Sequence, residues 1–192
     1  TGGTTTESNK VESLLNDALE NEEYAVVTTA GFEPSSNMNK LVVEAVKRLR
    51  ENEGRKVRGV IPTDADTTYN YEGISTVVNG YTLSDGTNVD VKDATGYFAG
   101  ISASADVATS LTYFEVEDAV SAYPKFDNEK TIKALDAGQI VFTTRPGQRV
   151  VIEQDINSLH KFTAEKPQSF SKNRVMRTLD EIATDTENTF ER

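Results

Sequence analysis

Several residue types on which chemistry depends are absent or scarce in this sequence. The chain has no cysteine, which excludes disulfides, thiolate metal sites and a cysteine nucleophile. His160 is the only histidine, which removes most acid–base, metal and catalytic-triad schemes. No apolar run approaches the roughly 20 residues of a membrane span, and no signal peptide begins the chain. We therefore expect no membrane association and no histidine- or cysteine-based catalysis.

The charge balance argues against one more class of function. With 31 acidic and 20 basic side chains, the chain carries a formal net charge of −11. General nucleic-acid binding needs a basic face that displaces counterions from phosphates, so we expect no nucleic-acid partner. The length of 192 residues suits one domain, or a domain with a small appendage, and allows a substantial core.

The first third of the sequence predicts helices and strands in alternation. The expected segments are a helix over 9–19, a strand over 24–29, a helix over 37–53 and a strand over 56–61. Asn9 can cap the first helix with Glu12 reaching back, and Gly54 can end the second helix. The strand over 24–29 lacks alternation, which indicates cover on both faces. This order predicts a βαβ unit with parallel strands.

The remaining sequence predicts two β-hairpins and further helices. The turns Ser84-Asp85-Gly86 and Arg145-Pro146-Gly147-Gln148 predict hairpins around 75–91 and 139–156. A helix rich in small residues over 94–108 favours close approach by another backbone, and a strand is expected over 111–116. Helices are expected from Asp127 or Asn128 to Gly138 and over about 171–189. The predicted fold class is α/β, with a mixed β-sheet flanked by helices.

The last helix has an unusual order of charges. Lys172, Arg174 and Arg177 stand near its start, and acidic residues follow from Asp180 onward, so both ends oppose the helix dipole. Two explanations stay open: the charges pair with neighbouring strands of the same fold, or the basic end faces another molecule. The expected buried stripe of this helix consists of Val175, Leu179, Ile182, Thr186 and Phe190.

A second basic cluster ends the helix over 37–53 and begins the strand after it. Its members are Lys47, Arg48, Arg50, Arg55, Lys56 and Arg58. Cations near a helix C-terminus are favoured by the dipole, which is the simpler explanation. In an assembly, Arg48, Arg50, Arg55 and Lys56 could instead meet the acidic surface of a neighbouring copy.

Catalytic and metal-binding patterns are weak. Asp155, Ser158 and His160 have the residue types of a triad but lie too close in sequence to converge easily. Gly100 to Ser104 begins like a nucleophile elbow, yet has serine where the second glycine is required. A calcium loop at Asp64, Asp66 and Glu72 would need glycine at the position of Tyr69. No phosphate-binding glycine motif occurs, so no cofactor is expected.

An ordered series of motifs carries a family resemblance over essentially the whole chain. These are NGYTLSDGTNVDV, GYFAGISASADVATSLTY, GQIVFTTRPGQRVVIEQD and INSLHKFTAEKPQSFSKNRVMRTLDEI. In this order they resemble the sheath protein of contractile phage tails and of phage-like particles such as R-type bacteriocins and prophage elements. The resemblance implies a core fragment without the family's terminal arms, with the α/β sheath core over 1–165 and the start of the C-terminal sheath region over 166–192.

The resemblance also implies a structural role and no enzymatic activity. Many copies would polymerise helically around an inner tube and contract to drive that tube through a target cell envelope. The implied partners are other sheath subunits, the inner tail tube protein, and baseplate and tail terminator proteins. The implied location is a virion tail or phage-like particle assembled in the host bacterial cytoplasm. Because the resemblance implies that the arms that join subunits are missing, the isolated fragment is expected to be a monomer.

For the inner-tube contact, the charge order of the last helix favours Lys172, Arg174 and Arg177. Two alternatives from other classes remain at this stage. One is an α/β hydrolase that works through carboxylates such as Asp64, Asp66 and Glu153. The other is a surface adhesion module, favoured by the loops rich in threonine, asparagine and aspartate.

Overall fold

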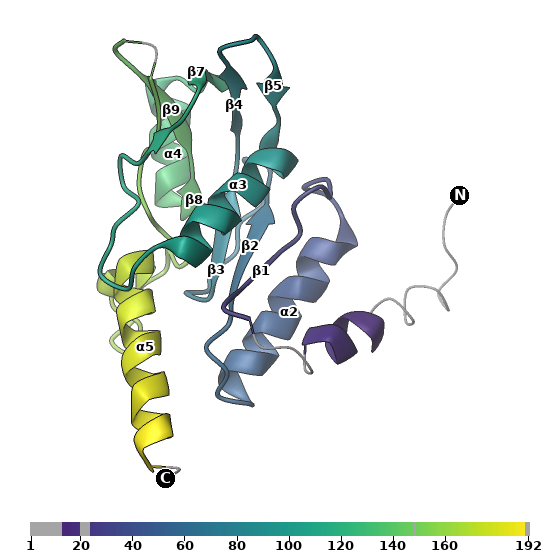
Figure 1. The fold of residues 1–192 in the computed structure, drawn as a ribbon, viewed down its shortest axis with the longest axis vertical. Helices are drawn as coiled ribbons and strands as arrows, with labels where there is room; N and C mark the ends of the chain where they lie inside the picture. Colours follow the sequence, from purple (N-terminus) through teal and green to yellow (C-terminus); the bar gives the residue numbers. More distant parts are fainter. Residues whose placement is uncertain (1–12, 20–23, 148, 191–192) are drawn as a thin grey trace.

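The computed structural model describes residues 13–19, 24–147 and 149–190 (Figure 1). The helices are α2 (Asn37–Glu51), α3 (Val91–Ser104), α4 (Asn128–Asp136) and α5 (Asn173–Phe190), with a 3-10 turn, η1, at Gln168–Ser171. The strands are β1 (Val26–Thr28), β2 (Arg58–Pro62), β3 (Ile74–Val77), β4 (Gly80–Leu83), β5 (Asn88–Val89), β6 (Glu115–Val116), β7 (Ala119–Tyr123), β8 (Gln139–Ile140), β9 (Phe142–Arg145) and β10 (Arg149–Ile152). Residues 13–19 are also helical, whereas the expected caps Asn9 and Glu12 lie outside the described residues.

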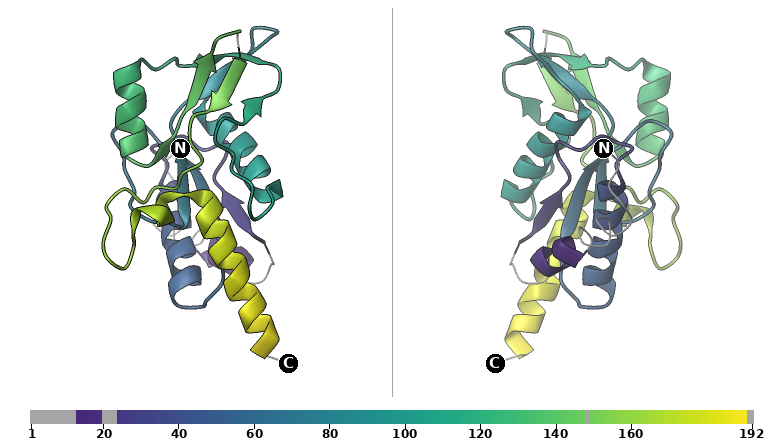
Figure 2. Two further views of the ribbon diagram at one scale, coloured as in Figure 1. Left: turned by 90° about the vertical axis from the view of Figure 1, so that its left-hand side faces the viewer. Right: turned by 90° about the vertical axis from the view of Figure 1, so that its right-hand side faces the viewer.

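A parallel sheet forms one half of the molecule. Its strand order is β1-β2-β3-β8, and every pairing in it is parallel. Helix α2 packs on one face through Val46 and Ile61, and α3 covers the other face, where Val60 and Phe98 share a buried cluster (Figure 2). The predicted βαβ unit, β1-α2-β2, is therefore confirmed. The prediction that the first strand is covered on both faces is confirmed: Val26 packs against the cluster that contains Phe98 and Val27 against the cluster that contains Val46, although both stay half-buried in this edge strand.

Two antiparallel sheets form the other half, with strand orders β5-β4-β7 and β6-β10-β9. Both predicted hairpins are present, β4 with β5 and β9 with β10. Gly147 adopts a φ of +84° in the second turn, as the Pro-Gly sequence requires. The predicted strand over 111–116 shrinks to β6, and β7, which the sequence did not indicate, completes the other sheet.

Each predicted hairpin run divides between two sheets. β3 belongs to the parallel sheet and β4, two residues later, to an antiparallel one; β8 and β9 repeat this division around Val141. Asn79 lies where the two runs meet. Its Oδ1 accepts from the Phe142 N–H at 2.8 Å and its Nδ2 donates to the Phe142 carbonyl at 2.9 Å. One side chain thus replaces the backbone pairing that is lost where the strands change sheets.

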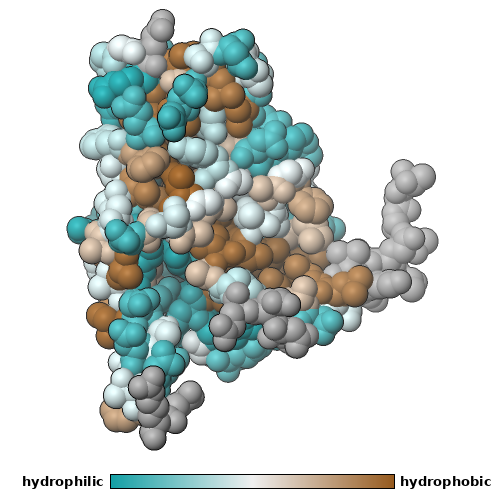
Figure 3. All heavy atoms as spheres, in the orientation of Figure 1, coloured by the Kyte–Doolittle hydropathy of each residue, from teal (hydrophilic) through white to brown (hydrophobic). Residues whose placement is uncertain are grey.

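Small residues in α3 allow close packing at one point rather than along the whole helix. A Cβ on Gly96 would lie 3.1 Å from the Ala30 Cβ, whereas a Cβ on Gly100 would meet nothing within 4 Å. In Figure 3 a hydrophobic band crosses the middle of the molecule in the region of β1, whereas the end formed by α5 is mostly hydrophilic.

Candidate functional site

Helix α5 begins on the core and then extends away from it (Figures 1 and 2). An isolated bridge between Ile156 and Lys172 aligns its start, and the Asn173 N–H donates to the Asp155 carbonyl at 3.2 Å. Lys172 and Arg174 are exposed, and the Lys172 Nζ donates to Gln154 Oε1 at 3.2 Å. Both residues are therefore accessible on the surface of this chain.

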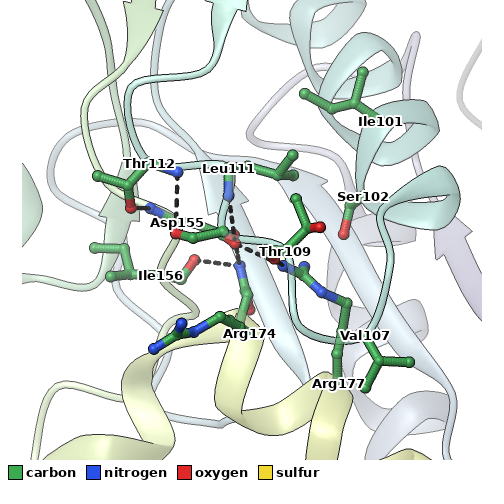
Figure 4. Close-up of polar contacts among 12 residues, drawn as sticks. Ile101, Ser102, Val107, Thr109, Leu111, Thr112, Asp155, Ile156, Arg174 and Arg177 are labelled. Carbon is green, nitrogen blue, oxygen red and sulfur yellow. Dashed lines mark hydrogen bonds and ion pairs between the residues drawn. The ribbon is translucent and has the colours of Figure 1, made fainter.

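Arg177, by contrast, is a buried residue. Its side chain is 3% exposed, and its Nη2 contacts the Oδ2 of Asp155, itself 1% exposed, at 2.8 Å. The same nitrogen donates to the Thr109 carbonyl (Figure 4). The expectation that Arg177 presents its charge to another protein is corrected: its guanidinium is used inside the fold.

Asp155 organises the junction between α5 and the core (Figure 4). Its Oδ2 also accepts from the Leu111 N–H at 3.1 Å, and its Oδ1 accepts from Asn173 Nδ2 at 2.9 Å. Its own N–H donates to Thr112 Oγ1 at 2.9 Å. One carboxylate thus joins α5 to the segment that connects α3 with β6.

The reversed charge order of α5 follows from pairs within this chain. Asp180 accepts from both terminal nitrogens of Arg50, at 3.0 and 2.7 Å, in a nearly buried pair. Glu187 lies 3.9 Å from the Lys56 Nζ. Together with Asp155 and Arg177, these contacts favour the simpler explanation of the helix charges, namely pairing with neighbouring elements.

The second basic cluster is also engaged internally. Arg48 pairs with Glu53 at 2.6 Å, and Arg55 donates to the Leu19 carbonyl at 2.7 Å. Arg50 and Lys56 have the acidic partners on α5 described above. The prediction that these four residues contact a neighbouring subunit stays a prediction, and the structure shows that each already has a partner within the chain.

An open groove of about 630 Å³ runs beside α5, between its acidic face and the ends of α3 and β2. Arg58 and Arg177 line it, together with Val107, Asp180 and Glu181. Burial, followed by the nearby charge of Arg177, lowers the pKa of Arg58 to about 10. Within the described residues, the one hydrogen bond of the Arg58 side chain goes to the Ser102 Oγ, at 3.4 Å. The sequence groups Arg58 with a basic cluster, and no local pattern indicates that a second arginine, Arg177, lies near it in the fold.

The carboxylates considered for hydrolysis, Asp64 and Glu153 among them, bind different partners in different parts of the fold. Asp64 accepts hydrogen bonds from the N–H groups of Asp66 and Thr67 within its own loop. Desolvation raises the pKa of this carboxyl, but the hydrogen bonds, mainly those from Thr67, outweigh it, so the pKa is lowered. Glu153 accepts from Arg145 Nη2 and Thr143 Oγ1 at 2.6 Å each. Neither set resembles a pair of catalytic carboxylates, and the hydrolase alternative gains no support.

The residues considered as a triad point to different partners. The Ser158 Oγ donates to the Tyr71 carbonyl at 2.9 Å, and the His160 Nδ1 contacts the Ser158 carbonyl at 2.9 Å rather than its hydroxyl. Among residues 13–19, 24–147 and 149–190, no group of three or more His, Cys, Asp or Glu side chains is arranged to hold a metal ion. Within the same residues, no helix has the length and apolar character needed to cross a bilayer.

Comparison with known proteins gives a consistent result. A sequence model of the phage tail sheath protein central domain matches residues 8–158. The phage-like element PBSX protein XkdK of Bacillus subtilis is 42% identical over 141 residues, which cover 73% of this chain and 30% of XkdK. The uncharacterized protein YqbK of the same organism is 38% identical over 164 residues, which cover 85% of this chain and 34% of YqbK.

A solved structure extends the likeness to the fold. The crystal structure of the sheath tail protein from Desulfitobacterium hafniense superimposes with a TM-score of 0.88 at 34% identity and covers all of this chain, which spans 44% of that protein. The chain thus spans about a third of the length of the curated relatives and less than half of that solved structure.

Proposed function

The chain belongs to the phage tail sheath protein family, and we propose that it is the core of a subunit that polymerises helically around an inner tube and contracts to drive that tube through a target cell envelope. The match over residues 8–158 carries this proposal, because it covers both halves of the fold. The 34% identity to a sheath tail protein of the same fold supports it independently.

The proposed partners follow from this role. They are further sheath subunits, the inner tail tube protein, and baseplate and tail terminator proteins. Contacts between non-equivalent surfaces that do not close into a ring generate helical tubes, which is the geometry that a sheath requires. The proposed location is the tail of a virion or phage-like particle, assembled in the bacterial cytoplasm.

Within this proposal, residues 1–165 form the sheath core and residues 166–192 begin the C-terminal sheath region. The buried contact of Asp155 with Arg177 supports a rigid connection between the two, since it fastens the first turns of α5 to the core. We propose that the chain acts mechanically and catalyses no reaction, because the carboxylates of the hydrolase alternative are bound in unrelated contacts.

The tube contact is proposed at the exposed residues Lys172 and Arg174, and Arg177 is left out because it is buried. Exposed charge pairs contribute about 0–1 kcal/mol each, which suits a contact that must be released on contraction. The test uses the full-length sheath protein, co-expressed with its tube protein, carrying Lys172→Glu and Arg174→Glu together. Negative-stain microscopy should show bare tubes or empty sheaths in place of sheathed tubes.

A matched control makes the same charge change elsewhere. Lys125 and Lys130 are also exposed, so the variant with Lys125→Glu and Lys130→Glu carries the same net charge. It should form normal sheathed tubes. Normal tails in the Lys172→Glu, Arg174→Glu variant would overturn the assigned contact, and the absence of any sheath from the unmodified full-length protein would overturn the proposed function.

A further inference from the structure

The junction between α5 and the core contains more buried cations than anions. Arg50, Arg58 and Arg177 meet there, and the carboxylates that face them are Asp155 and Asp180. Asp180 is held by both terminal nitrogens of Arg50, and Asp155 is held by Arg177. Among the described residues, no carboxylate lies within ion-pair distance of Arg58. Of the three arginines, Arg58 is therefore the one that has no paired carboxylate among the described residues.

In the residues that the structure describes, the buried donors that lack acceptors belong to Arg177, which lines the groove together with Arg58. The Nε and Nη1 atoms of Arg177 are buried and have no hydrogen-bond partner within the described part of the chain. Across residues 13–19, 24–147 and 149–190, the Arg58 side chain has a single long hydrogen bond, to Ser102. A buried guanidinium without a full set of acceptors is costly, because the protein does not replace the water that it has lost. The lowered pKa of Arg58 also shows that its positive charge is poorly compensated by its surroundings.

The groove makes these two arginines accessible to an anion from solution. Its volume of about 630 Å³ far exceeds that of a carboxylate, and Arg58 and Arg177 lie on its wall. The other cations of its wall already have partners: Lys56 lies near Glu187, and Arg55 donates to the Leu19 carbonyl. Arg58 is the less buried of the two, so an anion that enters here would contact Arg58 and would also feel the nearby charge of Arg177.

We propose that the groove between α5 and β2 is an anion-binding site that takes one carboxylate on Arg58. The carboxylate comes either from an acidic side chain of a second copy of this chain or from a free carboxylate in solution. The chain is rich in suitable groups, with 31 acidic residues. The second-copy source rests on the proposed function, whereas the existence of the site does not.

Glu181 is a carboxylate of this chain that could itself pair with Arg58. It lines the groove and is exposed, and within the described residues it forms no ion pair. Its negative charge opposes a second anion in the groove, so Glu181→Gln should bind a free carboxylate more tightly than the unmodified chain. If Glu181 were itself the missing partner, the unmodified chain would not bind a free carboxylate.

The test follows the arginine Nε–H signals of the ¹⁵N-labelled chain by NMR while acetate replaces chloride at constant ionic strength. The signals of Arg58 and Arg177 should shift and saturate. Arg58→Gln should weaken acetate binding about tenfold or more, since a hydrogen bond to a charged group is lost. Arg149→Gln, which removes an exposed cation that pairs with Glu115, should leave acetate binding unchanged.

A second arm identifies the source. With no acetate present, the same signals are followed as the chain concentration rises. If the arginine signals shift as the chain concentration rises, and do not shift in Arg58→Gln, the carboxylate comes from a second copy. If the signals respond to acetate and not to chain concentration, the carboxylate is a free one. Either result supports the site. The proposal fails if neither arm moves the Arg58 and Arg177 signals, or if Glu181→Gln binds acetate no better than the unmodified chain.

Discussion

At the scale of single residues, the fold depends on polar side chains that the sequence presents as surface groups. Arg177 follows the helix period at a position expected to be exposed, yet its side chain is 3% exposed because Asp155, 22 residues earlier, receives it. Long charged residues are almost never buried unless they are paired, and the partner is set by tertiary structure. No local pattern could therefore have predicted this pair.

Removal of the Asp155 carboxylate should destabilise the chain strongly. Asp155→Ala removes the ion-pair partner of Arg177, one acceptor of Asn173 and the acceptor of the Leu111 N–H in a buried site. Breaking a buried ion pair costs about 3–5 kcal/mol, so we expect a loss of that order in the free energy of unfolding, measured with urea. Asp66→Ala is the control; its side chain is 93% exposed, and the change should stay within about 0.5 kcal/mol. Similar urea midpoints for the two variants would contradict the role given to Asp155.

At the scale of elements, periodicity and turn chemistry predicted what is local. Helices α2 and α4, the βαβ unit and both hairpin turns were predicted because Asp85-Gly86, Pro146-Gly147 and Gly54 determine backbone conformation on their own. The division of each β-run between two sheets was not predicted, because residues 139–145 contain no glycine or proline to mark it, and Asn79 and Gly80 lie inside a run over 74–83 that is otherwise mostly apolar or β-branched. Pairing partners decide where such a stretch changes sheets.

Helix α5 shows the limit of an apolar stripe as evidence for burial. The sequence predicted Leu179, Ile182 and Phe190 to be buried, and that prediction is wrong within this chain: they are 38%, 57% and 84% exposed. The helix leaves the core after its first turns, so only its beginning, at Asn173, Met176 and Arg177, is buried. An apolar stripe shows that a surface can be covered and does not identify what covers it.

Two truncations on α5 should therefore differ in cost. Met176→Ala removes a side chain that is 5% exposed and should lower the free energy of unfolding by about 2–5 kcal/mol. Ile182→Ala removes one that is 57% exposed and should change it by no more than about 0.5 kcal/mol. Urea unfolding of the isolated chain measures both. Equal costs would mean that the second half of α5 is packed in solution.

At the scale of the whole molecule, the parallel and antiparallel halves share one buried cluster and one bridging side chain. Val60 and Val77 of the parallel sheet pack with Phe142 and Val150 of an antiparallel one. Asn79 connects the same two halves through its bonds to Phe142 and to the Pro124 carbonyl. The contacts therefore connect the two halves mechanically, and the proposed role as a contracting subunit would require such a connection.

Asn79→Ala should weaken this connection more than its size suggests. The side chain is 0% exposed, and its loss leaves the N–H and the carbonyl of Phe142 without partners in the core. Each buried unsatisfied group costs about 1–3 kcal/mol, so the free energy of unfolding should fall by about 2–5 kcal/mol. Hydrogen exchange should increase first in β9 and β10, because they lose their attachment to β3 and β4, whereas β1 to β3 should stay protected. Asn88→Ala, at an exposed amide in the β4–β5 hairpin, should change neither property measurably. Uniform loss of protection across both halves in Asn79→Ala would show that they unfold as one unit and that Asn79 is no more than a local packing residue.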